Sequence, residues 1–226
     1  MLSTGQVSFN DLTPAPGVTQ RDVVLTTNRG TITIGPGGLT GTLINLDLIA
    51  KQLTVNGPLT NSYTSSNSGI RAIVGDSTNT YDTSYSPSDN THDWLASSTS
   101  PGSTSSALAV DITPLGSLTA GRIELIVNDQ GAGVRNFGKL YASAGDAVIL
   151  ANGDVGVTDG SIVAEHDIQV TTTGAVSLAH AQVSAANDVS VSANGISLSD
   201  DANGPTLLAT NTGLVNLTST ADKCDE

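Results

Sequence analysis

The chain has 226 residues, of which 24 are glycine, and only 3% of its residues are aromatic. This composition, rich also in Ser, Thr and Asn, favours many short strands and turns and argues against an ordinary helical or α/β enzyme. The formal net charge is −13 and no cluster of Lys or Arg is present to neutralise phosphates, so nucleic acid and anionic membrane surfaces are poor partner candidates.

The first residues carry no targeting signal. Residues 1–11 lack the basic start and the long apolar run of a secretory signal peptide, so the sequence as written predicts a chain that stays in the cytosol. Cys224 is the only cysteine, which excludes an internal disulfide and leaves the redox compartment undefined.

The N-terminal part divides into two segments. Residues 1–20 are expected to be an extended segment, in which Pro14 and Pro16 break any regular element. Alternating apolar residues then begin, and residues 21–75 are expected to form the first coils of a repeating β structure.

Two elements within these first coils are distinctive. Residues 31–34 read as a strand closed by the turn Gly35-Pro36-Gly37-Gly38. Residues 43–53 fit a strand but also one face of a helix, through Leu46, Ile49 and Leu53. We favour the strand because strand-and-turn units recur downstream.

Residues 76–106 differ from their surroundings. This segment is rich in Ser, Thr, Asn, Asp and Pro and has no regular apolar period, so we expect it to lie outside the coils as a long loop or small hairpin. Its aromatic cluster of Tyr81, Tyr85, His92 and Trp94 has two interpretations. The side chains either pack the segment against the flank of the coils, which we favour, or recognise a partner or a sugar.

Residues 107–220 contain the main repeat, followed by a charged tail at residues 221–226. Asp146, Asp167 and Asp188 recur every 21 residues, and Gly153, Gly174 and Gly195 follow at the same step. Alternating apolar pairs come after each Asp and each Gly, which is the pattern of short half-buried strands. The sequence therefore predicts a β-solenoid of about 21 residues and three strands per coil, with about eight coils. The glycines are expected to supply the positive φ of a sharp corner.

A family resemblance rests on several segments in a fixed order. Residues 107–126 (ALAVDITPLGSLTAGRIELI) and 131–138 (GAGVRNFG) resemble segments of filamentous-haemagglutinin-like exoproteins of two-partner secretion systems, and residues 30–39 (GTITIGPGGL), 46–50 and 55–59 resemble the preceding coils. The resemblance implies an all-β, right-handed parallel β-helix with an extra-helical insertion. It also implies secretion or cell-surface display through an outer-membrane two-partner secretion transporter, and a role as an adhesin, haemagglutinin or contact-dependent growth inhibition protein.

This chain departs from the family pattern in one respect. It contains no Asn-Pro dipeptide, whereas the secretion domain of the family begins with a capping region and Asn-Pro-Asn-type motifs. We therefore expect an internal fragment, whose uncovered terminal coils associate end to end with other copies.

Acidic side chains are the remaining candidates for chemistry. Asp146, Asp167 and Asp188 are expected to stack on one edge as solvated corner acids that accept turn hydrogen bonds. Glu165, His166, Asp167 and His180 suggest a metal site, but adjacent strand residues point to opposite faces, so we do not expect them to converge.

We therefore assign no catalytic residue, no cofactor and no metal ligand. The leading hypothesis is a non-catalytic rod that presents surfaces for cell contact, and the receptor is not indicated. The alternative is a carbohydrate-binding or polysaccharide-degrading β-helix, which turnover of pectin-like polysaccharides would reveal.

Overall fold

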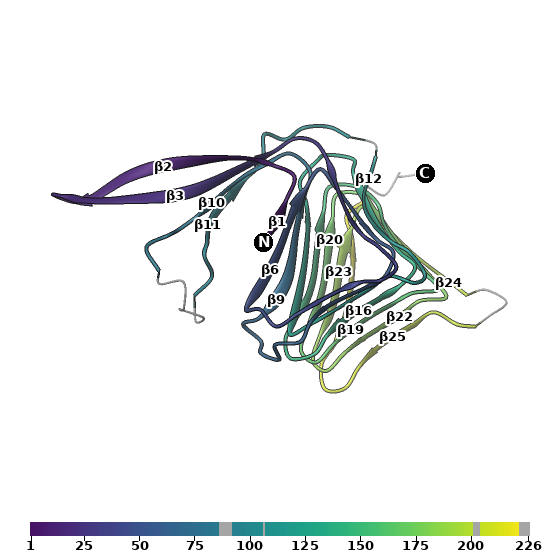
Figure 1. The fold of residues 1–226 in the computed structure, drawn as a ribbon. Coiled ribbons are helices and arrows are strands. Elements are labelled where there is room, and N and C mark those ends of the chain that lie inside the picture. Colours follow the sequence, from purple (N-terminus) through teal and green to yellow (C-terminus); the bar gives the residue numbers. More distant parts are fainter. Residues whose placement is uncertain (86–91, 106, 201–203, 222–226) are drawn as a thin grey trace.

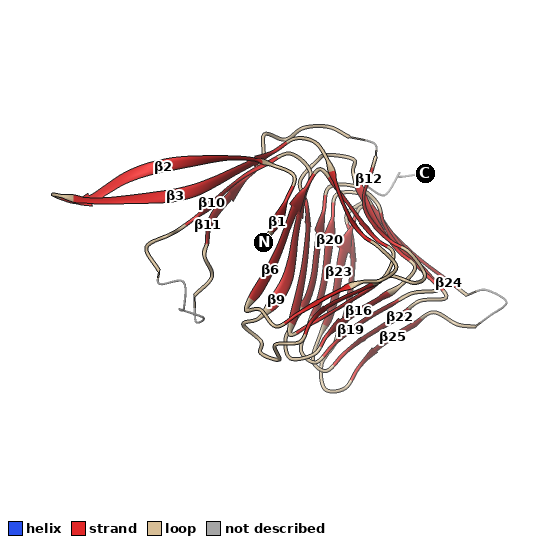
Figure 2. Ribbon diagram, viewed as in Figure 1, coloured by secondary structure: helices blue, strands red, loops and turns tan. Residues whose placement is uncertain are grey.

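A computed structural model describes residues 1–85, 92–105, 107–200 and 204–221. All the regular elements in these ranges are β-strands, most of them wound into a three-sided solenoid (Figures 1 and 2). The described residues include no helix of the length and apolarity needed to cross a membrane. The predicted fold class is confirmed: the chain is an all-β parallel solenoid of about 8 turns with about 22 residues per turn.

Each face of the solenoid is a parallel sheet in which successive coils contribute successive strands, and the last strand along the chain adds to the first face alone. The first face has eight strands: β1 (Leu2–Ser3), β6 (Asn45–Ala50), β9 (Gly69–Val74), β14 (Arg122–Val127), β17 (Ala147–Ala151), β20 (Ile168–Thr172), β23 (Val189–Ala193) and β26 (Val215–Ser219). The second face has seven: β4 (Thr31–Ile34), β7 (Gln52–Val55), β12 (Leu108–Ile112), β15 (Gly133–Asn136), β18 (Val155–Thr158), β21 (Ala175–Ala179) and β24 (Gly195–Ser199). The third face has seven: β5 (Leu39–Gly41), β8 (Pro58–Asn61), β13 (Ser117–Ala120), β16 (Lys139–Ala142), β19 (Ser161–Ala164), β22 (Gln182–Ala185) and β25 (Leu207–Thr210).

A fourth sheet, in which neighbouring strands are antiparallel, lies outside the solenoid, and we call it the outer sheet. Its strand order is β11 (Leu95–Thr99), β10 (Ser77–Tyr81), β3 (Val18–Thr27) and β2 (Gln6–Ala15). The hairpin of β2 and β3 projects away from the coils, as Figure 1 shows.

The core consists of columns of aliphatic side chains that run along the solenoid axis. On the first face the parallel register stacks one such column, with Leu48, Ala72, Leu125, Ile149, Val170, Val191 and Leu217 in succession. Every member is buried except Leu217, in the last coil, which is 42% exposed. Strands about 4.8 Å apart bring each side chain into contact with its counterparts, and medium aliphatic residues fill this narrow interior without voids.

The repeat length is less uniform than predicted. The middle coils keep the step of 21 residues, as between Asp146 and Asp167. The step is 24 between Asp47 and Arg71, in the early coils. It is 26 between Asp188 and Leu214, at the last coil. Extra residues at the corners leave the strand stacking unchanged, so the coil tolerates them.

The role predicted for the repeating glycines is wrong. Gly153, Gly174 and Gly195 are not among the described residues with positive φ. A Cβ at Gly153 would lie 2.5 Å from the backbone of Gly131, and one at Gly174 would lie 2.5 Å from that of Gly153. At these two corners glycine is therefore needed because the neighbouring coil comes too close. Gly195 has open space around it, and nothing in the structure explains it.

The N-terminal segment is also more regular than predicted. Residue 14 belongs to β2, which is an edge strand, and its ladder with β3 shifts register between Leu12 and Ala15. Pro14 is tolerated there because an edge strand does not need every N–H, and Pro16 lies in the following turn. The expected boundary between residues 20 and 21 falls inside β3, so the hairpin is one unit.

The structure also bears on the expectations for residues 43–53 and for the insertion. Residues 43–53 form strands rather than a helix, since β6 and part of β7 cover them. The insertion contributes the β10–β11 hairpin outside the coils, which confirms that it does not line the core. The tail at 222–226, with Cys224, and residues 86–91 of the insertion lie outside the described residues.

Candidate functional site

The outer sheet covers the outward side of the first face at its N-terminal coils. Ile49, Ile73 and Ile126 point outward from successive strands of this face, and Leu25 and Tyr81 of the outer sheet pack against them. Because one set of residues faces the solenoid core and the other faces the outer sheet, β9 is buried along its whole length. The unbroken apolar runs at 48–50 and 72–74 are the sequence signal for such two-sided burial.

The aromatic cluster of the insertion serves this packing. Tyr81 is buried and Trp94 packs against the same apolar cluster, which confirms the favoured interpretation for these two residues. Tyr85 and His92 stack on each other, with ring centroids 4.1 Å apart.

A buried charged group connects the outer sheet to the first face. Arg71 donates from Nε to Asp47 Oδ1 at 3.0 Å, and from its two terminal nitrogens to the carboxylate of Asp93 at 2.6 and 3.0 Å. The Tyr81 hydroxyl donates to Asp47 Oδ2 at 2.8 Å. Arg71 and Asp47 are each only 5% exposed, so the two acids keep the guanidinium paired in a region of low dielectric.

Burial and pairing act against each other on the pKa values of this group. Burial by itself lowers the pKa of Arg71, but the hydrogen bonds and negative charges of Asp93 and Asp47 outweigh it and raise the pKa. Burial likewise raises the pKa of Asp93, but its hydrogen bond with Arg71 and the charge of Arg71 lower it overall. Burial and Asp47 both raise the pKa of the Tyr81 hydroxyl, so this group stays a neutral donor.

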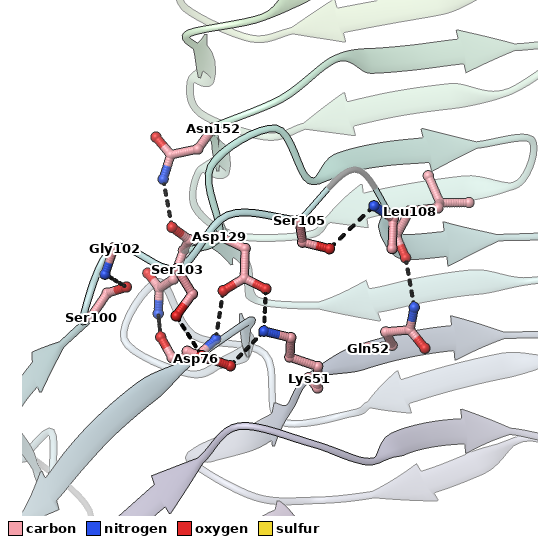
Figure 3. Close-up of polar contacts among 12 residues, drawn as sticks. Lys51, Gln52, Asp76, Ser100, Gly102, Ser103, Ser105, Leu108, Asp129 and Asn152 are labelled. Carbon is pink, nitrogen blue, oxygen red and sulfur yellow. Dashed lines mark hydrogen bonds and ion pairs between the residues drawn. The ribbon is translucent and has the colours of Figure 1, made fainter.

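A second charged group fixes both ends of the insertion, as Figure 3 shows. Lys51 Nζ lies 2.5 Å from Asp76 Oδ1 and 2.6 Å from Asp129 Oδ2. Asp129 Oδ1 accepts the backbone N–H of Asp76 at 2.8 Å, and the Ser103 hydroxyl donates to Asp76 Oδ2 at 2.5 Å. Burial raises the pKa of Asp76, but the hydrogen bonds from Lys51 and Ser103 lower it overall. Asp76 thus joins the start of the insertion to its end and to two coils.

A cavity of about 530 Å³ lies between the outer sheet and the beginning of the first face. Its lining is mainly apolar, with Val23, Leu43, Ile44 and Trp94, and Asp47 and Asp93 contribute carboxylates. Both carboxylates already accept hydrogen bonds from Arg71, and Asp47 also accepts one from Tyr81, so the cavity suits an apolar group better than a charged one.

The predicted stack of corner acids exists. Asp146 Oδ1 accepts the backbone N–H of Asp167 at 3.1 Å, Asp167 Oδ1 accepts that of Asp188 at 3.0 Å, and Asp188 Oδ1 accepts that of Leu214 at 2.8 Å. The acceptor role is confirmed, but each bond joins one coil to the next, whereas the sequence suggested bonds within a turn. Asp154 makes the same kind of bond with the N–H of Ala175 at another corner.

The expectation that the metal-site candidates would not converge is wrong for His166 and Asp167. His166 and Asp167 converge: Nδ1 of His166 lies 2.6 Å from Asp146 Oδ1 and 3.2 Å from Asp167 Oδ2. The alternation argument fails because His166 lies in a bend and Asp167 lies between that bend and β20, so neither residue is in a strand. The hydrogen bond to Asp146, with the charges of Asp167 and Asp146, raises the pKa of His166.

The other two candidates for a metal site, Glu165 and His180, lie apart from His166 and its two aspartates. Glu165 accepts a hydrogen bond from the Tyr141 hydroxyl at 3.1 Å. His180 is at a different corner, where its Nδ1 lies 2.8 Å from Asp159 Oδ1. Both His180 and Asp159 have positive φ, which sequence reasoning missed because neither residue is a glycine.

Comparison with known proteins identifies relatives of this chain and a related fold. No protein-family model matches the chain. The chain is 32% identical over 153 residues to Toxin CdiA of Yersinia pestis, and 28% identical over the same length to tRNA nuclease CdiA-2 of Burkholderia pseudomallei strain 1026b. The crystal structure of a filamentous haemagglutinin secretion domain matches with a TM-score of 0.53, over 96% of this chain and 58% of that one, at 22% identity. The chain is a CdiA-like and filamentous-haemagglutinin-like protein of two-partner secretion.

This CdiA-like chain spans a small part of its curated relatives. The alignments cover 67% of this chain but only 4% of each CdiA protein. At 22% identity, the likeness to the haemagglutinin domain concerns the fold.

The motif that carried the resemblance has a physical role in the fold. In residues 131–138, Asn136 is fully buried, and its side chain accepts the N–H of Gly138 at 2.9 Å and donates to the carbonyl of Ser161 at 3.2 Å. It therefore closes the corner after β15 and connects this coil to the next one.

Proposed function

We propose that this chain is a non-catalytic part of a secreted, cell-surface exoprotein, in which the solenoid is a stiff rod and the outer sheet presents a contact surface. The parent would act in cell contact, as an adhesin or a contact-dependent inhibition protein. The outer-membrane transporter of its two-partner secretion system would be the partner that binds the outer sheet. The observation that carries the proposal is the exposed apolar surface of β2, which extends beyond the solenoid.

The register of the outer sheet produces this surface. Phe9 lies opposite Val23, which lies opposite Tyr81, so the three side chains share one face of the sheet. Tyr81 is buried against the coils, whereas Phe9 is 61% exposed and the neighbouring Val7 is 60% exposed. The apolar face therefore continues from the buried cluster to a free edge strand, and such an edge is a template for pairing with another chain.

The role of the corner acids favours a rod over an enzyme. A polysaccharide-cleaving site needs a pair of carboxylates available at a cleft. Asp146, Asp154, Asp167 and Asp188 instead each accept a backbone N–H from the following coil. The name tRNA nuclease CdiA-2 belongs to a protein of which this alignment covers 4%, so that activity is not transferred to this segment.

A secretion assay tests the contact surface. Val7→Ser combined with Phe9→Ser is introduced into the parent protein, which is co-expressed with its outer-membrane transporter. We expect the secreted amount to fall by at least ten-fold while the thermal unfolding of the purified chain stays unchanged. The matched control is Val148→Ser with Val163→Ser, which removes apolar side chains from the outer surface of the solenoid. Wild-type secretion of the hairpin variant would contradict the proposal.

A second assay tests the non-catalytic role. The purified chain is incubated with pectin-like polysaccharides, with and without Ca²⁺, and new sugar ends are measured. We expect no turnover above buffer, and calcium-dependent turnover would favour the carbohydrate-active alternative.

A further inference from the structure

Three potential metal ligands meet at the corner between the third and first faces. His166 and Asp167 lie at the corner between β19 and β20, and Asp146 occupies the corresponding corner one coil earlier. One ligand atom from each of the three residues can be chosen so that all of them lie within 4.8 Å of one another. From this geometry we propose that Asp146, His166 and Asp167 bind one divalent transition-metal ion of the zinc class, which links two adjacent coils.

The spacing of the donor atoms fits an ion of this kind. Nδ1 of His166 is 2.6 Å from Asp146 Oδ1 and 3.2 Å from Asp167 Oδ2. In a tetrahedral zinc site, bonds of about 2.0–2.1 Å place neighbouring donors roughly 3.3 Å apart. The separation of His166 from Asp167 already meets this requirement. The separation from Asp146 needs an opening of less than about 1 Å, which two partly exposed side chains can supply.

The two carboxylates are held in place by groups other than the ion. Asp146 Oδ1 accepts the backbone N–H of Asp167 at 3.1 Å. Asp167 uses its other oxygen, Oδ1, to accept the N–H of Asp188 at 3.0 Å, so Oδ2 is the atom turned toward His166. Outer-shell hydrogen bonds of this kind orient ligating carboxylates and strengthen metal affinity.

The local charge also favours a cation. Corner aspartates on adjacent coils lie about one strand spacing, roughly 4.8 Å, apart. Two such carboxylates repel each other, and a divalent ion that both of them bind removes this repulsion. One imidazole and two carboxylates suit Zn²⁺, Ni²⁺ or Cu²⁺ better than Ca²⁺ or Mg²⁺, which prefer oxygen ligands alone.

The site is accessible to solvent and should exchange its ion readily. The side chain of His166 is 54% exposed, and those of Asp146 and Asp167 are each 40% exposed. Three protein ligands leave room for water in the remaining positions. A competing arrangement uses the same residues without a metal, with a protonated His166 as the cation that pairs with both acids.

Metal titration separates these two arrangements. The full chain carrying Cys224→Ser, which removes the thiol as an alternative ligand, is freed of metal and titrated with ZnCl₂ by isothermal calorimetry at neutral pH. We expect one Zn²⁺ per chain, a higher midpoint of thermal unfolding in Zn²⁺, and at least ten-fold weaker binding of Ca²⁺. His166→Gln and Asp167→Asn should each weaken Zn²⁺ binding by at least ten-fold.

Two variants control for general effects. His180→Gln makes the same change at the other described corner with a His–Asp pair. Asp154→Asn removes the negative charge of a coil-to-coil acceptor at a corner other than that of His166, and keeps an oxygen that can accept the N–H of Ala175. Both variants should bind Zn²⁺ with the same affinity as the Cys224→Ser chain. Circular dichroism checks that every variant is folded. Absence of Zn²⁺ binding, or binding that persists in His166→Gln, would overturn the proposal and favour the protonated histidine.

Discussion

The strongest quantitative prediction concerns two leucines of the same core column. Leu125 and Leu217 both occupy the column that also contains Ile149, but Leu125 has a coil on each side whereas Leu217 lies in the last coil described. Leu125 is fully buried and Leu217 is 42% exposed. Leu→Ala at the two positions therefore makes the same chemical change in two packing environments.

The expected magnitudes follow from these environments. At Leu125 the truncation removes buried methyl groups and leaves a cavity between two rigid coils, so the free energy of unfolding should fall by about 3 kcal/mol, within the usual range for buried leucines. At Leu217 part of the side chain is already in water and no closed cavity can form, so the loss should be about 1 kcal/mol.

Equilibrium unfolding in urea, followed by far-ultraviolet circular dichroism, measures both values. The slope with denaturant should be unchanged in each variant, so that the midpoints report stability. Equal losses at the two positions would refute the stacking argument, because they would mean that the neighbouring coil does not determine the contribution of a core side chain.

Four other predictions test separate parts of the structure. Val170→Asp should destabilise the solenoid by several kcal/mol because it buries a charge, whereas Gln169→Asp should have little effect on the unfolding midpoint because residue 169 is exposed. Arg71→Met should leave the buried Asp47 without its cation and remove the partner of the partly exposed Asp93, and so detach the outer sheet. Faster proteolysis of the insertion would show this, and an unchanged cleavage rate would count against it. The pKa of Asp76 is lower in the folded than in the unfolded chain, so ionised Asp76 stabilises the folded state. This stabilisation should be complete above the unfolded pKa of about 3.9 and should disappear as pH falls through the folded pKa. Acid unfolding curves of the chain would measure the loss. End-to-end association should increase with salt as the charge of −13 is screened, and light scattering from a strictly monomeric particle at high salt would contradict it.

The sequence by itself determined the fold class and the inner surface of the coils. The 21-residue step and the alternation around residues such as Val170 and Val191 predict a β-solenoid because each strand must turn every second side chain into a shared core. The exclusion of residues 76–106 from that core followed from the same reasoning, since a polar segment without an apolar period cannot line it. The stacking of Asp146, Asp167 and Asp188 also followed from the repeat, because residues at the same position of each coil lie above one another.

Tertiary structure decided how residues on different coils and segments meet. The pairing of Arg71 with Asp93 depends on where the insertion folds back, and that of Lys51 with Asp129 depends on how the coils stack. No local pattern encodes either contact. The convergence of His166 with Asp146 depends on a bend, where strand alternation no longer applies. The glycine at position 153 is required by the backbone of the neighbouring coil and not by its own φ. Local periodicity specifies which side chains face inward, but the distances between coils and the outer sheet arise only when the whole chain is packed.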